Sequence, residues 1–481
     1  MQIRLSRSLS AGILLIGVLF VFAITVACSS VAPEPESEQQ LTQSSGAPSQ
    51  QAPATPVLEV TPQSDASDAS PMLAPTIEPA PQSTTVVAPS ATPFAATATV
   101  QSATATSVPL SASEVNEGGV MPDADFERAL NAARLNTRGW DTDFRLHTVP
   151  YSEIRFVIPR DNIPSIDSPE FIGPSEASAW LKDVEPVVAL EIFGDARAYP
   201  LQILTWHEIV NDSVGGVPVA VTFCPLCNSA IAFDRRLDGE VLEFGVSGNL
   251  RNSDLIMYDR QTHSWWQQFT GEGIVGQHAG RDLEHLSASI VSFADFKEAQ
   301  PDGKVLSRDT GFARQYGRNP YAGYDTADGN PFLFTGDLDG RLLPVDRVIA
   351  VTVDEVDVAF PLGVVQEEGV INYEIGKRQI AVFHKFGTTS ALDATVIAES
   401  RDVGSAGVFD AVLDGQLLTF SIQDEGIVDD QTGSSWNILG TAIDGPLAGQ
   451  SLSPVVHGNH FWFAWAVFKP DTILYEGRNG A

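Results

Sequence analysis

Two cysteines, Cys224 and Cys227, have the residue type and spacing in this 481-residue chain that are best suited to chemistry. Two residues separate them, so both sulfur atoms can converge on one metal ion or close a small disulfide ring. They follow a β-branched, apolar run at 217–223, which predicts that the pair lies at the end of a strand. The pair is therefore the first candidate site.

Two further side chains can complete a metal site around these thiols. His207 precedes Cys224 on a predicted helix or turn that leads into the same strand, and Met257 can add a thioether from an apolar strand. Thiolate, imidazole and thioether are soft ligands that select copper(I) or zinc over magnesium or calcium. The hypothesis is a copper or zinc site for metal handling or redox chemistry, formed by Cys224, Cys227, His207 and Met257, with no catalytic residue assigned.

Two alternatives stay open for the cysteine pair. In thiol–disulfide exchange, the more exposed cysteine attacks as a thiolate. In a non-catalytic extracellular binding module, the pair is only a structural staple. Among other polar residues, Asp254 is expected to cap a turn, and His457 and His460 are expected in a solvated loop. The sequence therefore does not decide whether the protein is an enzyme.

The chain around the cysteines is predicted to be one half of an internal duplication. An Ala-Tyr-Pro-Leu run at 198–201 recurs as Ala-Phe-Pro-Leu at 359–362, and an Asp-x-Gln-Thr-x-Ser-x-Trp run at 259–266 recurs at 429–436. Repeats of this kind indicate two units of one fold. At the offset of the first pair, the candidate ligands are absent from the second copy: Cys224 corresponds to Lys385, Cys227 to Thr388 and His207 to Glu368. The scaffold does not itself require thiols, which favours a functional role for them.

Within the two copies, the pattern predicts a mainly β fold with a few short helices. Short apolar runs bounded by Gly, Pro, Asp or Asn predict strands at 187–192, 217–223 and 230–233. Helical segments are predicted at 124–134, 175–181 and 203–210. The predicted organisation is lobe one with the cysteine site at 119–310, a connector at 311–339 and lobe two, a degenerate repeat, at 340–481.

The first 118 residues are predicted to form a signal peptide and a disordered tether. Two arginines precede an apolar run that ends in small residues before Cys28, the pattern of a lipoprotein signal peptide at 1–28. Residues 29–118 are rich in Ser, Thr, Pro and Ala, and they bury too little apolar surface to offset the entropy of ordering. The prediction is an exported protein, anchored in a lipid bilayer through acylated Cys28 at the outer face of a bacterial membrane, on the cell surface or in the periplasm.

The charge of the chain excludes one class of partner. The formal net charge is −33, whereas a nucleic-acid-binding protein needs clustered cations to contact phosphates. Only three cysteines occur, so the chain is not a disulfide-rich scaffold. Protein partners are not indicated by the sequence.

Four longer motifs in lobe one are specific. They are His-Glu-Ile-Val-Asn-Asp at 207–212, Cys-Pro-Leu-Cys-Asn-Ser-Ala at 224–230, Phe-Gly-Val-Ser-Gly-Asn-Leu at 244–250 and Met-Tyr-Asp-Arg at 257–260. Together they resemble a widespread prokaryotic family catalogued as a domain of unknown function, DUF3179. The resemblance covers lobe one and extends to both lobes. It implies a shared fold and an exported setting, and it carries no activity and no catalytic residue.

Overall fold

The structure, a computed structural model, describes residues 116–326, 331–424 and 426–478. The predicted signal peptide with Cys28, and the predicted tether as far as residue 115, lie outside the described residues and stay predictions. In the described ranges, no helix is both long enough and apolar enough to cross a membrane.

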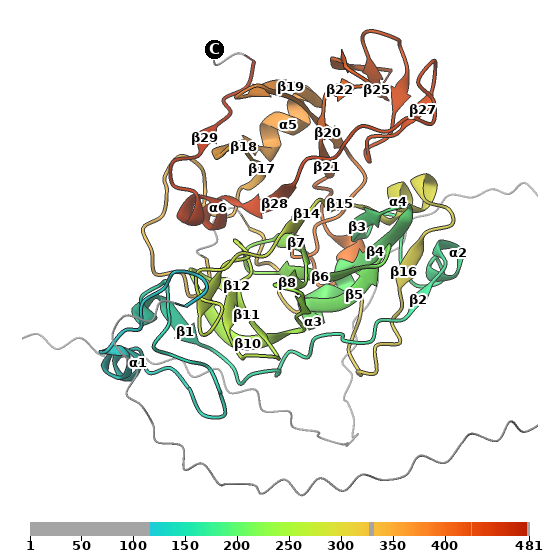
Figure 1. The fold of residues 1–481 in the computed structure, drawn as a ribbon. Helices are drawn as coiled ribbons and strands as arrows, with labels where there is room; N and C mark the ends of the chain where they lie inside the picture. Colours follow the sequence, from blue (N-terminus) through green and yellow to red (C-terminus); the bar gives the residue numbers. More distant parts are fainter. Residues whose placement is uncertain (1–115, 327–330, 425, 479–481) are drawn as a thin grey trace, which may run out of the picture. The chain divides into compact units, whose positions relative to one another are not determined.

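The predicted mainly β fold is confirmed, and lobe one contains three sheets with short helices in some of the connections between strands (Figure 1). The first sheet has the order β15 (Ser289–Ser292), β3 (Pro186–Ile192), β4 (Asp195–Pro200), β16 (Lys304–Leu306) and β2 (Phe171–Ile172). The second has the order β14 (His285–Leu286), β7 (Ser229–Asp234), β6 (Val217–Cys224) and β5 (Ile209–Val214). The third has the order β1 (Ile154–Phe156), β10 (Phe244–Arg251), β11 (Asp254–Asp259), β12 (Trp265–Gln267) and β13 (Gly273–Val275).

Lobe two also contains three sheets. They have the orders β28 (His457–Phe461), β17 (Arg347–Val353), β18 (Val356–Pro361) and β29 (Ile473–Leu474); β19 (Val370–Ile375), β20 (Arg378–Lys385) and β21 (Ser405–Asp410); and β24 (Phe420–Gln423), β25 (Gly426–Asp429), β26 (Ser435–Trp436) and β27 (Ala442–Asp444). Each lobe adds a small hairpin, β8 (Arg236–Leu237) with β9 (Glu240–Val241) and β22 (Val412–Leu413) with β23 (Gln416–Leu417).

The helices are few and short, as predicted. They are α1 (Phe126–Ala133), α2 (Pro174–Ala177), α3 (Leu201–His207), α4 (Phe293–Ala299), α5 (Leu362–Glu368) and α6 (Trp462–Phe468), with 3-10 turns at Tyr151–Glu153 and Ile397–Glu399. Helix α3 ends earlier than the predicted 203–210. Glu208 adopts the left-handed conformation and stops the helix, and β-branched Ile209 and Val210 begin strand β5.

The order of elements and the strand pairing are alike in the two lobes. In the first sheet of each, one pair of strands is parallel, β4 with β16 and β18 with β29, and the remaining pairs are antiparallel. The repeated Asp-x-Gln-Thr-x-Ser-x-Trp runs also make the same contact. The indole N–H of Trp266 donates to Asp259 at 2.8 Å, and that of Trp436 donates to Asp429 at 3.1 Å. These matches support the predicted duplication; a common origin of the lobes stays a prediction.

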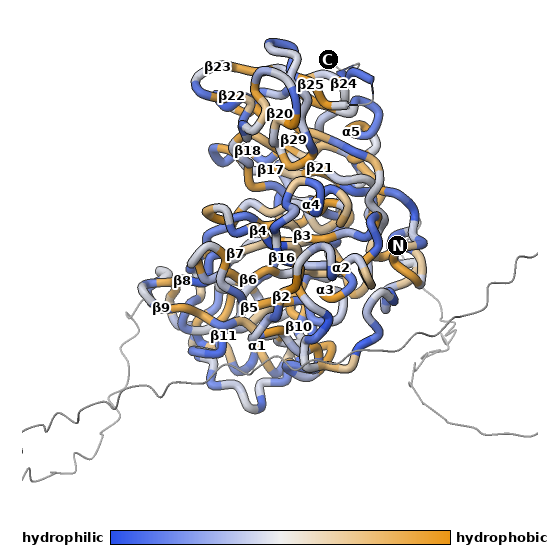
Figure 2. Tube along the Cα trace, turned by 90° about the vertical axis from the view of Figure 1, so that its right-hand side faces the viewer, coloured by the Kyte–Doolittle hydropathy of each residue, from blue (hydrophilic) through white to orange (hydrophobic). Residues whose placement is uncertain are grey.

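One hydrophobic cluster extends through both lobes. It contains Phe223 and Cys224 of β6 together with Phe461 of β28 and Trp462 of α6. In Figure 2 many hydrophobic stretches follow the strands, while many outer loops are hydrophilic. Because burial of apolar area is the main favourable term in folding, this shared cluster couples the cysteine strand to lobe two.

His460 corrects the expectation of a solvated loop. It lies in strand β28, is 4% exposed, and stacks on Trp465 with ring centroids 5.9 Å apart. Its Nδ1 is buried without a hydrogen-bond partner in the described residues. Burial, followed by the nearby imidazoles of His457 and His285, lowers the pKa of His460 to about 3.

We expect His460 to make the protein less stable in acid. Between pH 3 and 6.5 the unfolded chain binds a proton on this side chain and the folded protein does not, so the free energy of unfolding falls as the pH falls through this window. The slope from one such group reaches about 1.4 kcal/mol per pH unit. Urea unfolding of wild type and of His460→Phe, measured across this range, should show a shallower pH dependence in the variant. Parallel profiles would contradict the expectation.

Candidate metal centre

The two cysteines lie at the turn that joins β6 to β7. Cys224 is the last residue of β6 and pairs with Ser229, and the Cys227 N–H donates to the Cys224 carbonyl at 3.2 Å. Asn228 completes the turn with a positive φ of 49°, a conformation that asparagine tolerates better than most residues. Both cysteines are free thiols, and their exposed fractions are 1% and 0%. The tight turn therefore brings both thiols to one buried place.

Asp254 is the third member of this group. It begins strand β11, after a turn in which Asn252 and Ser253 both have positive φ. One oxygen of its carboxylate and the two cysteine sulfurs all lie within 4.8 Å of one another. Its Oδ2 accepts hydrogen bonds from the Gln267 amide at 2.6 Å and from the Phe269 N–H at 3.0 Å, while its Oδ1 is buried without a hydrogen-bond partner in the described residues.

The surroundings of this group disfavour negative charge. Burial is the main cause that raises the pKa of both thiols, and it raises the pKa of Asp254 to about 6. Asp254 and Glu208 raise the pKa of Cys224 further through their own charge. The thiols are therefore protonated at neutral pH, and a bound cation is what would stabilise their deprotonated forms.

Glu208 occupies a position that usually holds glycine. It follows α3 with φ of 60°, and the residue that follows α5 in lobe two is Gly369 with φ of 69°. A side chain with a β-carbon costs roughly 1–2 kcal/mol in this conformation. Burial raises the pKa of Glu208 to about 8, and Tyr321 donates to its Oε1 at 3.4 Å. Such backbone strain clusters at functional sites, which makes Glu208 a candidate functional residue.

The structure does not bring His207 into this group. Its Nδ1 lies 2.7 Å from the Pro164 carbonyl oxygen and its Nε2 lies 2.7 Å from the Tyr316 hydroxyl, so both ring nitrogens have partners. Met257 is fully buried in the same hydrophobic cluster as the two cysteines, where it pairs across the strands with Val246 and Trp266. Their roles as ligands stay predictions, and Asp254 takes the place beside the thiols.

The connector also contributes to the site. The hydroxyl of Ser253 donates to the carbonyl of Phe332, and Tyr321 and Tyr324 lie close enough for the charges of the cysteines to raise their pKa values, after burial as the main cause. The sequence predicts 311–339 only as a connector between the lobes. The aromatic residues in it were the signal that this segment is packed against the body.

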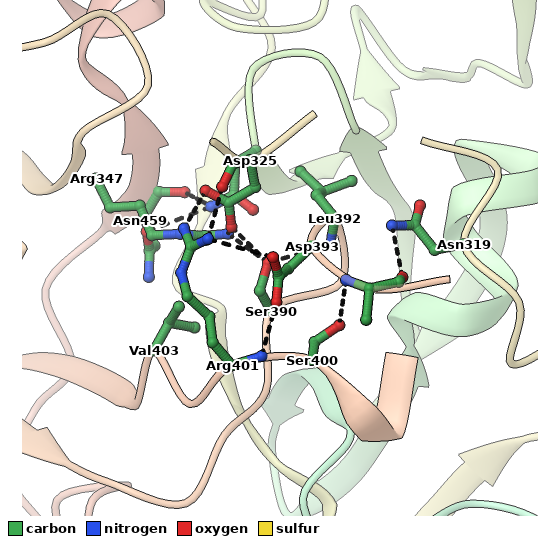
Figure 3. A network of polar contacts seen from close by, with 12 residues as sticks. Asn319, Asp325, Arg347, Ser390, Leu392, Asp393, Ser400, Arg401, Val403 and Asn459 are labelled. Carbon is green, nitrogen blue, oxygen red and sulfur yellow. Dashed lines mark hydrogen bonds and ion pairs between the residues drawn. The ribbon is translucent and has the colours of Figure 1, made fainter. Parts of the chain in front are cut away.

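A buried polar network fixes the connector to lobe two. Asp325 accepts from Arg347 of β17 at 2.6 Å and from the Ser390 hydroxyl at 2.6 Å, and Arg401 binds its other oxygen at 2.5 Å (Figure 3). Asp325 is fully buried and Arg347 is 8% exposed. The network therefore holds Tyr324, the preceding residue, beside the cysteine turn.

Strand β28 of lobe two touches the cysteine turn directly. The Phe461 N–H donates to the Cys227 carbonyl at 2.9 Å, and the Asn228 side chain donates to the Asn459 carbonyl at 2.9 Å. One backbone carbonyl and one side chain of the turn are thus hydrogen-bonded to lobe two. The candidate site is built by both lobes and the connector, although its ligands come from lobe one.

A cavity of about 510 Å³ lies next to this group. Its wall includes Leu226, between the two cysteines, and Leu255, next to Asp254. Glu208, Tyr321 and Tyr324 also line it, and most of its other lining residues are apolar. Cavities of this size accommodate small organic molecules.

Comparison with known proteins identifies a family and no activity. No curated protein and no solved structure matches the chain. A family model described as "Protein of unknown function (DUF3179)" matches residues 160–472, which include most of both lobes, the connector and the two cysteines with Asp254. The chain belongs to this family, DUF3179.

Proposed function

We propose that the protein binds one zinc ion through Cys224, Cys227 and Asp254. The observation that carries this proposal is the approach of two thiols and a carboxylate to within 4.8 Å in a fully buried place. The buried Oδ1 of Asp254 supports it, because it faces only the two thiols as donors in the described residues, and a bound cation would stabilise this carboxylate oxygen better than weak S–H donors do.

The donor set favours zinc over copper(I). Zinc binds both thiolate and carboxylate ligands, whereas copper(I) prefers sulfur, and the third member of this group is a carboxylate. Three protein ligands are typical of catalytic zinc sites, in which a fourth position takes water or a substrate. Zinc in such a position acts as a Lewis acid and lowers the pKa of bound water.

Thiol–disulfide exchange is less well supported. A reactive cysteine needs a lowered pKa, which an adjacent cation or a helix N-terminus provides. Here the charges that act on Cys224 are those of Asp254 and Glu208, both of which raise its pKa. A plain structural staple is also less well supported, because the cysteines are free and lobe two repeats the fold without them.

The test is metal analysis of the full protein purified without added chelator, with a count of its free thiols. We expect one zinc per chain and two thiols that become reactive only after a chelator removes the metal. If the protein contains copper in place of zinc, the result supports the metal site and changes the identity of its metal. A protein that holds no metal after dialysis against zinc, and whose thiols form a disulfide under mild oxidation, would favour the redox alternative.

We also propose that the chain is exported and anchored through lipid on Cys28. The support is the apolar run before Cys28 and the composition of the segment that follows it. The Cys28→Ser variant should lose the acyl mass and either leave the membrane fraction or keep its signal peptide. Unchanged mass and unchanged fractionation would contradict lipidation.

A further inference from the structure

We propose that the cavity beside the metal centre binds an uncharged, largely apolar organic molecule as the substrate or ligand of that centre. The inference rests on the proposed function in one respect, since the molecule would lie next to the metal. The shape, charge and unmet hydrogen bonding of the cavity carry it, and none of these depends on the metal.

The shape fits a small molecule. The volume of about 510 Å³ lies within the roughly 300–1,000 Å³ typical of small-molecule sites. The apolar lining comes from several elements, which are the segment after β1, strands β10 and β11, and the connector: Val157, Ile158, Ile163, Leu250, Leu255 and Phe332. Because apolar side chains from several elements line it, an apolar body would remove apolar surface from water there.

The described lining offers an anion no cationic side chain. The described lining residues include no Lys, Arg or His, and the carboxyl group of Glu208 is among them. Asp254 is not a lining residue and precedes the lining residue Leu255 in the chain. Away from the metal, a phosphate or carboxylate would therefore enter an apolar space whose lining offers no cationic side chain, at a high cost in desolvation.

Asn249 supplies the polar contact. It lines the cavity, is 1% exposed, and its Oδ1 is buried without a partner in the described residues. It lies at a bulge, since Val246 pairs with Met257 and Asn249 with Ile256 while Ser247 and Gly248 stay unpaired. A β-carbon on Gly248 would lie 2.0 Å from the Ile158 carbonyl oxygen, so this close bulge requires glycine. A ligand with an N–H or O–H group would satisfy the Asn249 acceptor.

The experiment uses two fluorescent probes that share one ring framework. N-phenyl-1-naphthylamine is uncharged and has an N–H donor, and 8-anilino-1-naphthalenesulfonate adds a sulfonate. We expect the full protein to bind the uncharged probe saturably and at least about tenfold more tightly than the anionic one, because the sulfonate must be desolvated. Equal binding of the two probes, or no saturable binding of the uncharged one, would overturn the proposal.

Variants assign the binding to this cavity. Leu250→Trp fills it from a half-buried position and should abolish binding of the uncharged probe, while Ile422→Trp, on the matching hairpin of lobe two, should leave binding unchanged. Asn249→Leu should weaken binding about threefold to tenfold, which corresponds to one hydrogen bond. If Leu250→Trp binds the probe like wild type, the probe lies elsewhere and the proposal fails.

Zinc content of the same samples separates this inference from the proposed function. If the protein binds the uncharged probe selectively and holds no zinc, the metal proposal fails and the cavity proposal stands. If it holds zinc and does not discriminate between the probes, only the cavity proposal fails.

Discussion

Replacing Cys224 and Cys227 together by serine is expected to abolish zinc binding by the full protein. A serine hydroxyl does not deprotonate near neutral pH, so both positions lose the anionic sulfur that holds the ion. We expect the apparent dissociation constant for zinc to rise by at least about a thousandfold, since two of the three ligands are lost. Competition with a chromophoric chelator measures this change, and cobalt substituted for zinc reports the thiolates by their charge-transfer absorption.

The fold of this double variant should survive. The cysteines are free in the structure, so no cross-link is lost, and the sites differ from serine by one atom. The matched control is Thr388→Ser, at the lobe-two position that corresponds to Cys227. It should bind zinc like wild type. Asp254→Asn should weaken binding less than the double variant, and Asp424→Asn on the tip of the matching hairpin should not weaken it. Stoichiometric zinc in the double variant, with native circular dichroism, would refute the site.

Asp325→Asn is expected to have the largest effect on stability. Asp325 and Arg347 form an ion pair whose side chains are 0% and 6% exposed. Although burial alone would raise the pKa of Asp325, Arg347 and its other partners bring it below its usual value. Removing one charge leaves Arg347 buried without its partner, and this loss typically costs about 3–5 kcal/mol of the free energy of unfolding.

The same substitution elsewhere in the network provides the control. Asp393 contacts Arg401 at 3.4 Å, in a pair whose side chains are 28% and 47% exposed, so Asp393→Asn should cost less than about 1 kcal/mol. Urea unfolding measures both effects. Adding Arg347→Met to Asp325→Asn should restore part of the loss, because it removes the unpaired charge. Equal destabilisation by Asp325→Asn and Asp393→Asn would mean that burial does not set the strength of this ion pair.

The spacing of residues in the sequence predicts that the two cysteines lie together, but it does not predict that Asp254 joins them. Cys224 and Cys227 share one turn, so their spacing alone places them together. Asp254 reaches them only because the bulge in β10 and the following turn set where β11 begins, and a pairing shift of this kind depends on tertiary packing. His207 was favoured by its nearness in sequence, but Tyr316 and the Pro164 carbonyl engage its two nitrogens.

Two features of the sequence indicate that Glu208 and the connector belong to the site. Glu208 is aligned with Gly369, and an exchange of glycine for a charged residue at a helix end indicates a strained position. The connector carries Tyr321 and Tyr324, aromatic residues that a solvated link does not need. The mainly β class was predictable because alternation and turn residues are local properties, while contacts between lobes are not.

The hydrogen bond from the Phe461 N–H to the Cys227 carbonyl limits which fragments of this protein can keep the cysteine turn intact. A lobe can be excised intact only where its own residues satisfy its backbone groups. Here a strand of lobe two supplies a backbone partner to the turn that holds the cysteines. Excising lobe one would leave a carbonyl in the ligand turn exposed and the turn free to relax. The smallest piece of this chain that can keep the site intact is therefore the pair of lobes with their connector.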